Sequence, residues 1–427
     1  MPTDTEAPLL RLEEAREMML AGVSPLESAW TGLLDAVGAV LAAPVDALVT
    51  LPPWDNSAMD GYAVRSADVT DASPSHPVRL PVIGEVAAGH APSTVVAEGT
   101  AVRILTGAIV PTGADAIVPV EQTDAPSGVA DRPGVVSIHR PAATGAHVRP
   151  AGGDVRSGER VMHPGERVTS ARVALAAAVG HDGLVVHRRP RIAILATGDE
   201  LVPAGHPLGP AGIHDSNSVA LSAQCQEAGA DVVCVAIARD DATDVRVKLA
   251  DGIEKADVVV ASGGVSVGAH DVVKEAMSAV GTLDLWRVAV QPGKPLAFGR
   301  TTSADGRPVL LFGLPGNPVS SFVTFELFVR PVLRRLAGHP DPFARPTVSA
   351  RLTGPVAKSP ERRAFLRVIV ETDADRPDAR LATLAGGQGS HILSALARAD
   401  GLAIIPEGIE GLPAGSMVDV LLLERCA

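Results

Sequence analysis

The chain has 427 residues, which is long enough for more than one domain with a sizeable core, and its 46% apolar and 20% charged residues are ordinary for a globular protein. Its formal net charge of −12 argues against a nucleic-acid partner, because binding to a phosphate backbone requires a basic face. The charge leaves room for a local cationic pocket that binds an anionic small molecule.

The three cysteines form no CxxC pair and the histidines show no H-E-x-x-H spacing, so neither a cysteine nor a histidine zinc site is expected. The start of the chain is acidic and polar, unlike a secretion signal, and no apolar run approaches the roughly 20 residues that span a bilayer. We therefore expect a cytoplasmic protein with no membrane partner.

The first half of the chain combines helices with short strands. Apolar spacing predicts a helix over 9–22, and a capping box at Ser24–Glu27 predicts a second helix that ends near Leu41. Residues 78–122 form short apolar segments with frequent Gly and Pro, typical of strands. An Ala-rich helix is predicted over 169–180. The two ends of this half are expected to pack together as a scaffold around an inserted β domain.

Two polar loops interrupt this region. The stretch Leu51–Arg65 contains several Asp, Asn and Ser side chains that could face a ligand, although Asp60-Gly61 can equally be a plain turn. Thr106 follows an apolar strand and can expose its hydroxyl at the strand end. From the residues alone, Gly152-Gly153-Asp154 is best interpreted as a structural loop.

From Arg189 the pattern alternates between strand and helix, which predicts a parallel doubly wound sheet. Polar groups follow two of its strands, at Thr197–Glu200 and at Asp240. Open α/β sheets bind ligands at the carboxyl ends of their strands, so these groups are candidate ligand contacts. A charged strand end is usually just solvated.

Three loops of this segment combine backbone donors with a cation. The stretch Asp257–Asp271 contains a strand, a glycine-rich turn and a helix start, an order that attracts an oxyanion; it matches neither the dinucleotide fingerprint nor a P-loop. The loop Gln291–Pro295 presents Lys294, and the segment Gly313–Ser320 begins a second helix with Asn317 as its expected cap. Each loop alone is compatible with a purely structural role. Their joint occurrence favours a phosphate site.

Residues 340–427 return to strand patterns and predict a small β-barrel-like domain. Its polar loop Gly386–Ser394 offers possible ligand groups, but a structural role is favoured there.

The motifs DNSAMDGYAVR and RILTGAIVPTGADAIVPVE, together with the later loops in order and spacing, resemble the molybdopterin molybdenumtransferase family, which includes the E domain of gephyrin. The similarity covers nearly the whole chain. It implies a multidomain α/β plus β fold, with a discontinuous scaffold domain at 1–50 and 141–186, an inserted β domain at 51–140, a three-layer α/β molybdopterin-binding domain at 187–337 and a barrel-like domain at 338–427.

The resemblance also implies an activity: molybdenum insertion into adenylylated molybdopterin, with molybdate as co-substrate, Mg²⁺ assisting and AMP released. Family members are homodimers whose cleft joins the α/β domain of one subunit to the inserted β domain of the other. Contacts with the adenylyltransferase of the pathway and with apo-molybdoenzymes are further expectations.

The residues fall into three expected sets. The catalytic set is Asp60, Thr106, Asp154, Glu200, Asp271 and Lys294. The substrate-binding set is Thr197, Gly198, Ser262, Gly263, Gly264, Ser266, Gly268, Arg287, Pro315, Gly316, Asn317, Pro318 and Ser320. The candidate Mg²⁺ ligands are Asp271, Glu200 and Asp240, because this hard ion prefers carboxylate oxygens and water.

One departure from the family pattern concerns charge near the expected anion site. The family usually has lysine at the positions of Arg287 and Gln291. Arg287 keeps the positive charge, whereas the neutral Gln291 removes one positive charge near the expected anion site. Three alternatives remain: a non-catalytic pterin-binding or delivery scaffold, the adenylyltransferase that makes the substrate, and a tungsten-preferring insertase. The catalytic set argues against the first and the additional domains against the second, whereas the sequence does not separate the two metals.

Overall fold

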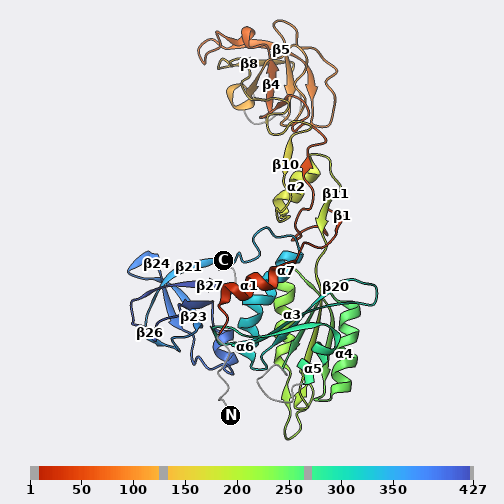
Figure 1. Ribbon diagram of the computed structural model, residues 1–427. Helices are drawn as coiled ribbons and strands as arrows, with labels where there is room; N and C mark the ends of the chain where they lie inside the picture. Colours follow the sequence, from red (N-terminus) through yellow and green to blue (C-terminus); the bar gives the residue numbers. More distant parts are fainter. Residues whose placement is uncertain (1–8, 125–132, 264–271, 424–427) are drawn as a thin grey trace, which may run out of the picture.

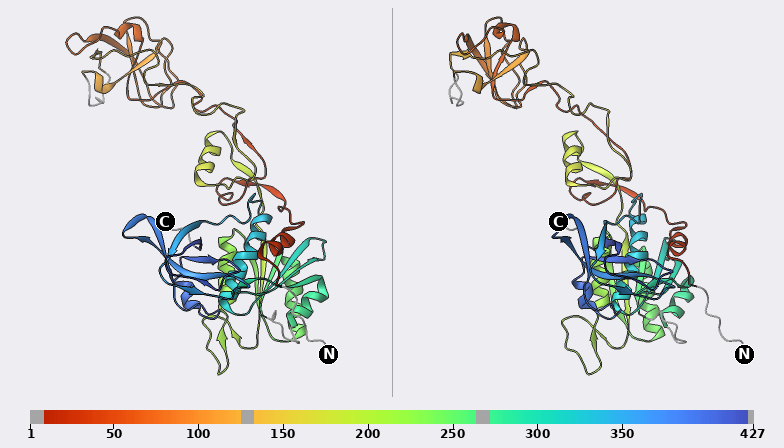
Figure 2. Two further views of the ribbon diagram at one scale, coloured as in Figure 1. Left: turned by 60° about the vertical axis from the view of Figure 1, so that its left-hand side comes forward. Right: turned by 90° about the vertical axis from the view of Figure 1, so that its left-hand side faces the viewer.

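The computed structural model describes residues 9–124, 133–263 and 272–423 of an elongated molecule (Figures 1 and 2). A β-sheet unit occupies one end, a small connecting unit follows, and an α/β unit and a β-barrel lie side by side at the other end. Within the described residues, none of the helices has both the length and the apolar character needed to cross a bilayer.

The α/β unit is built on a mixed six-stranded sheet in the order β15-β12-β16-β20-β19-β17. Its first four strands are parallel, as predicted. At the other edge β19 pairs antiparallel with β20, and β17 pairs antiparallel with β19, so the prediction of a parallel sheet is wrong there. The strand β19 continues from the PGKP loop and was not predicted. The bounds are β12 (Arg191–Thr197), β15 (Asp231–Ala238), β16 (Val258–Ser262), β17 (Thr282–Arg287), β19 (Pro295–Thr302) and β20 (Pro308–Leu314).

Helices cover both faces of this sheet because alternate side chains of its strands are apolar in both directions. On β12, Ile192 and Ile194 join one core, and Ala193 and Leu195 join the other. The first core packs against α3 (Ser216–Glu227), α6 (Pro318–Thr324), the π-helical turn η3 (Phe325–Val329) and α7 (Arg330–Leu336); the second packs against α4 (Ala242–Lys255) and α5 (Val272–Val280). A short parallel pair, β13 (Leu201–Val202) and β14 (Ile213–His214), follows β12.

A buried carboxylate fixes the amino end of the central strands. Asp257, 3% exposed, accepts hydrogen bonds from Arg188 Nη1 at 2.6 Å and from Arg191 N at 2.8 Å, and it lies 3.4 Å from Arg307 Nη1. Burial alone would raise the pKa of Asp257, but the hydrogen bonds from Arg188 and Arg191 hold it below its usual value. This network anchors the sheet at the amino ends of its parallel strands, opposite to the loops that follow their carboxyl ends.

The distant unit holds a five-stranded sheet in the order β7-β4-β6-β5-β8, with buried residues packed on both faces. A short pair, β3 with β9, connects it to the rest of the chain. The bounds are β3 (Asn56–Ser57), β4 (Gly61–Val64), η1 (Ser66–Val69), β5 (Val78–Val86), β6 (Ala101–Ile104), β7 (Ala116–Pro119), η2 (Val120–Gln122), β8 (Val135–Ile138) and β9 (Val148–Arg149).

The predicted helices flanking this unit have different outcomes. The first helix is confirmed as α1 (Leu12–Leu20) and the Ala-rich helix as α2 (Ser170–Ala178), whereas the helix expected from Ser24 to Leu41 is wrong. That segment forms β1 (Ser28–Gly32), which pairs antiparallel with β11 (Gly183–His187) and continues into turns that end at Gly38 with φ +88°.

Tertiary strand pairing therefore outweighs local helix capping there, and Gly32 and Gly38 favour the break. The connecting unit is completed by β2 (Val45–Asp46) and β10 (Arg160–Met162).

The C-terminal strands close into a barrel. The order β23-β24-β21-β27-β25 returns to β23, and β18 adds to the outside of β23. Closure removes the exposed strand edges and encloses a separate apolar core. The bounds are β18 (Val290–Gln291), β21 (Thr347–Leu352), β22 (Val356–Ala357), β23 (Arg363–Asp373), β24 (Arg376–Leu384), α8 (Leu393–Ala397), β25 (Gly401–Ile405), β26 (Gly411–Leu412) and β27 (Met417–Leu422).

Candidate functional site

The carboxyl ends of four parallel strands meet at one edge of the α/β sheet. Thr197 of β12 lies opposite Ala238 of β15, and Ser262 of β16 lies opposite Leu314 of β20. Thr197 and Ser262 are both buried. The loops predicted to bind substrate leave the sheet from these strand ends, which is where open α/β sheets form their ligand sites.

A side chain that the sequence analysis did not single out joins two of these loops. Asn217 lies in the first turn of α3, whose start is fixed by Asp215 accepting a hydrogen bond from Ser218 N at 3.0 Å. Its Nδ2 donates to Ser262 Oγ and to Gly316 O, each at 2.8 Å. One amide therefore ties the end of β16 to the loop after β20.

Glycine is required where these loops approach each other. Gly263 has φ +93°, donates to Leu314 O at 3.1 Å, and would place a Cβ 3.0 Å from both the carbonyl oxygen and the hydroxyl of Thr197. A Cβ on Gly316 would lie 3.6 Å from Gly263 Cα. The two loops pack backbone against backbone, which leaves their amides close to the strand ends.

Carboxylates gather beside the same edge. The carboxylate of Glu200 folds over Gly198, where a Cβ would come within 2.6 Å of Oε2, and Asp240 N donates to Asp199 Oδ1 at 3.3 Å. Glu200 and Asp240 are exposed. Among the residues that the structure describes, no group of three or more His, Cys, Asp or Glu is arranged to hold a metal ion.

The third expected ligand, Asp271, lies outside the described residues, as do Gly264, Ser266 and Gly268. The donor chemistry of Glu200 and Asp240 nevertheless fits Mg²⁺, which usually takes one or two carboxylates and completes its shell with water and substrate phosphate.

The loop that carries Lys294 packs against α6. Gly293 has φ +102°, and a Cβ there would lie 2.3 Å from Thr324 Oγ1 and 3.3 Å from Ser320 O. The half-buried Lys294 accepts a hydrogen bond from Val288 N through its carbonyl at 2.8 Å. Gln291, where the resemblance implies lysine, accepts a hydrogen bond from Ser359 N at 3.5 Å. The cation is thus presented by a loop held between the helix and the barrel.

The helix α6 begins at the expected residue but lacks the side-chain capping bond that was predicted for Asn317. Asn317 takes the capping position but makes no side-chain capping bond, and Pro318 follows it within the first turn. Val319 N donates to Ser390 O at 3.0 Å. The polar loop 386–394 of the barrel, for which a structural role was favoured, therefore contacts the start of α6 beside the candidate site.

A buried arginine lies behind that loop and was missed by the sequence analysis. Arg367 is fully buried, and its Nη2 donates to Gly387 O at 3.2 Å and Gly389 O at 3.1 Å. Its Nε and Nη1 have no hydrogen-bond partner, and burial lowers the pKa of its guanidinium. A buried cation with unused donors is a candidate anion contact, because unpaired buried charge is costly. Nothing in the sequence distinguishes it from the other arginines.

The distant β unit carries a second cluster. Asp60 precedes β4 and Thr106 follows β6; Thr106 donates its backbone N–H and its hydroxyl to Asp60 Oδ1, at 2.6 and 2.7 Å. These bonds, led by the backbone one, hold the pKa of Asp60 below its usual value, so the exposed carboxylate is ionised at neutral pH. Asp154 is exposed in the loop between β9 and β10 and donates its backbone N–H to Leu51 O at 3.1 Å.

The structure does not bring the two clusters together within one chain. The sheet carrying Asp60 and Thr106 lies at the far end of the molecule from the α/β unit in every view (Figures 1 and 2). Of the remaining expected residues, Pro315 follows β20, Ser320 is buried in α6, and Arg287 ends β17 with its carbonyl accepting a hydrogen bond from Leu10 N at 2.9 Å.

Comparison with known proteins gives a consistent assignment along the chain. Residues 10–180 match the model of the MoeA N-terminal region (domains I and II), residues 193–335 that of a probable molybdopterin binding domain, and residues 349–423 that of the MoeA C-terminal region (domain IV).

Among curated proteins, molybdopterin molybdenumtransferase 2 of Mycobacterium tuberculosis is 43% identical over 394 residues, covering 91% of this chain and 93% of the relative. Molybdopterin molybdenumtransferase 1 of the same organism is 36% identical over 430 residues, covering 97% and 98%. The crystal structure of a molybdopterin biosynthesis MoeA protein from Pyrococcus horikosii superposes with a TM-score of 0.79 at 33% identity, covering 97% of this chain and 99% of that one. The chain therefore belongs to the molybdopterin molybdenumtransferase family, a family of enzymes that act in molybdenum cofactor biosynthesis.

Proposed function

We propose that this enzyme transfers molybdenum from molybdate to molybdopterin, that it uses the adenylylated form of the pterin, and that it releases AMP in a Mg²⁺-dependent reaction. The observation that supports the proposal is the convergence of the strand-end loops at the carboxyl edge of the sheet, where the side-chain amide of Asn217 joins Ser262 Oγ to Gly316 O. Such an arrangement suits a phosphate-bearing ligand.

The chemistry needs charge neutralisation and positioning more than a covalent intermediate, since the reaction breaks a phosphoanhydride. The strand-end loops hold the phosphates, and the ammonium of Lys294 offsets the charge that develops on their oxygens. The buried guanidinium of Arg367 offers unused donors behind the loop that touches α6, and we assign it to an oxyanion on the same side. When bound by Glu200, Asp240 and Asp271, Mg²⁺ supplies electrostatic stabilisation of the phosphate oxygens.

The proposal includes a site shared between two subunits. Asp60 and Thr106 form a carboxylate–hydroxyl pair that is already hydrogen-bonded within a single chain. The pair lies far from the carboxyl edge of the α/β sheet of the same chain. We infer that a homodimer places this pair, with Asp154, against the loops of the other subunit to receive molybdate. We also propose the domain boundaries that the resemblance implies, namely 1–50 with 141–186, 51–140, 187–337 and 338–427.

The test supplies adenylylated molybdopterin, molybdate and Mg²⁺ to the purified protein and measures AMP release together with reconstitution of an apo-molybdoenzyme. We expect AMP to appear in step with reconstituting activity, and Asp271→Ala to abolish both while the melting temperature is unchanged. Tight binding of the pterin without AMP release would instead identify a delivery scaffold.

A further inference from the structure

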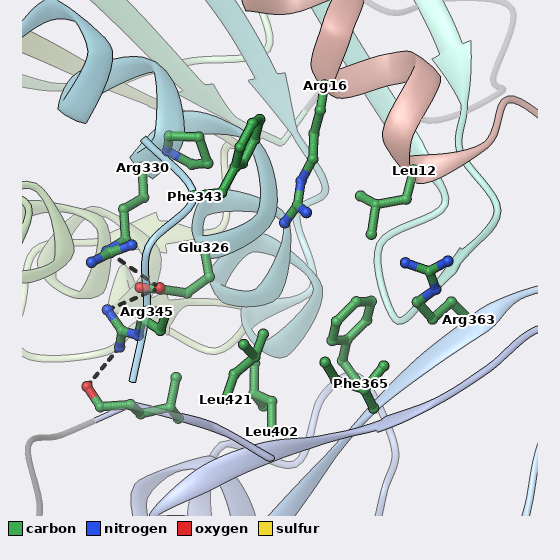
Figure 3. Close-up of a pocket in the computed structure, with 13 residues that line it drawn as sticks. Leu12, Arg16, Glu326, Arg330, Phe343, Arg345, Arg363, Phe365, Leu402 and Leu421 are labelled. Carbon is green, nitrogen blue, oxygen red and sulfur yellow. Dashed lines mark hydrogen bonds and ion pairs between the residues drawn. The ribbon is translucent and has the colours of Figure 1, made fainter. Parts of the chain in front are cut away.

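A separate cavity of about 110 Å³ lies where α1, the helical run through η3 and α7, and the barrel meet (Figure 3). None of the residues that line it belongs to the candidate site described above. Its walls carry four guanidinium groups, from Arg16, Arg330, Arg345 and Arg363, and one carboxylate, from Glu326. A cavity with this lining has a strongly cationic wall.

Most of these cations already have anionic partners. Glu326 is shared by Arg345, whose Nη1 lies 3.3 Å away, and by Arg330, whose Nε lies 3.9 Å away. Arg363 makes paired hydrogen bonds to Glu407, both at 2.8 Å, and a further bond to Glu13. The carboxylates of Glu326, Glu407 and Glu13 are therefore already paired with Arg330, Arg345 and Arg363.

Arg16 is the exception. It stacks over the ring of Phe343 at 5.0 Å and donates Nε to Leu327 O at 3.0 Å, but no carboxylate of the described residues lies within ion-pair distance of it. Its guanidinium points from α1 into the cavity (Figure 3). Burial lowers the pKa of Arg16 to about 10, and Arg330 is affected to the same extent for the same reason, which reflects how little water reaches these groups.

The cavity floor is apolar. Phe365, Leu402 and Leu421 face the space from the barrel and Leu12 from α1. A tetrahedral inorganic anion would leave this surface uncovered and several of its own oxygens without donors. A carboxylate on a branched apolar body would use both halves of the site, because guanidinium groups bind carboxylates in a fork and the floor removes apolar area from water. Because the space is smaller than the roughly 150 Å³ cavity that accepts benzene, it suits a ligand of at most about six non-hydrogen atoms.

We propose that this cavity binds a small organic carboxylate with an apolar body, held by the guanidinium of Arg16 against the barrel floor. Occupancy would link α1, α7 and the barrel. The proposal is independent of the proposed function, since it concerns no residue of that site.

The test titrates the full-length protein with isobutyrate and follows ligand binding by saturation-transfer difference NMR. We expect saturable binding, at least tenfold weaker binding of the isosteric neutral amide isobutyramide, and at least tenfold weaker isobutyrate binding by Arg16→Gln. Arg246→Gln, which removes an exposed arginine of α4, is the control and should bind as the wild type does. Arg16→Lys retains the charge without the fork and should bind with an intermediate affinity.

Four results would overturn the proposal: absence of saturable binding, equal affinity for isobutyramide, displacement of isobutyrate by equimolar inorganic phosphate, or unaltered isobutyrate binding by Arg16→Gln. Melting curves of both Arg16 variants show whether they fold, and if Arg16→Gln is unfolded, the Arg16→Lys result and the amide comparison decide the question.

Discussion

Asn217 provides the sharpest test of how the strand-end loops proposed to bind phosphate are held together. Asn217→Ala removes two hydrogen bonds of 2.8 Å, one to Ser262 Oγ and one to Gly316 O, without changing the backbone of α3. Each such bond contributes a net ~0.5–1.5 kcal/mol, so together they contribute roughly 1–3 kcal/mol to the relative placement of the loops. If that energy is expressed in substrate binding, KM for the adenylylated pterin rises about 5-fold to 150-fold.

The assay is steady-state AMP release over a range of pterin concentrations. Asn217→Asp keeps the shape of the side chain but sets a carboxylate oxygen against Gly316 O, so its KM should rise at least as much as that of Asn217→Ala. Ser222→Ala is the matched control on the same helix, because it removes a bond to Ser218 O and touches neither loop. Unchanged KM in both Asn217 variants would refute the idea that this amide positions the loops.

Three further outcomes are expected. Asp60→Ala should lose turnover while the protein stays folded with only a small fall in melting temperature, since the carboxylate is exposed and accepts two hydrogen bonds from Thr106; a folded variant with full turnover would remove Asp60 from the site. Asp257→Ala should destabilise the protein by about 1.5–3 kcal/mol in urea unfolding, because it removes the buried carboxylate that bonds partly exposed arginines, whereas Asp251→Ala, from an exposed helix pair, should change little; equal effects would contradict the anchoring role. The hydrogen bonds from Arg363 lower the pKa of Glu407 to about 2. The ionised carboxylate therefore contributes its full stabilisation above its unfolded pKa of about 4.3, and this stabilisation is lost as the pH falls toward 2. The melting-temperature gap between the wild type and Glu407→Gln should therefore close over that range, and a gap that widens on acidification would contradict the assignment.

The sequence was informative wherever hydrophobic periodicity and caps agreed with the tertiary structure. The helix after Asp215 and the strand from Val258 were predicted closely because local capping and buried apolar runs favour the same result as sheet packing. The helix predicted from Ser24 was wrong because its alternative, pairing with residues about 155 positions later, depends on a distant segment. The residues of a local segment carry no information on whether a distant strand will pair with it.

The candidate site shows the same limit. Gly263 and Lys294 could be singled out because their motifs are contiguous in sequence. Asn217 and Arg367 could not, because their importance arises only when separate segments fold together. An isolated Asn at a helix start predicts a cap-like role, and an isolated Arg on a barrel strand is expected at the surface.

Subunit mixing tests whether one active site takes residues from two chains. Asp60→Ala and Glu200→Ala homodimers, each inactive alone, are unfolded or dissociated together, reassembled at equal concentrations and assayed for AMP release. If the site joins Asp60 of one chain to Glu200 of the other, each mixed dimer contains one intact site, and random pairing restores about one quarter of wild-type activity. If both residues act within one chain, every site keeps one lesion, and the mixture stays inactive.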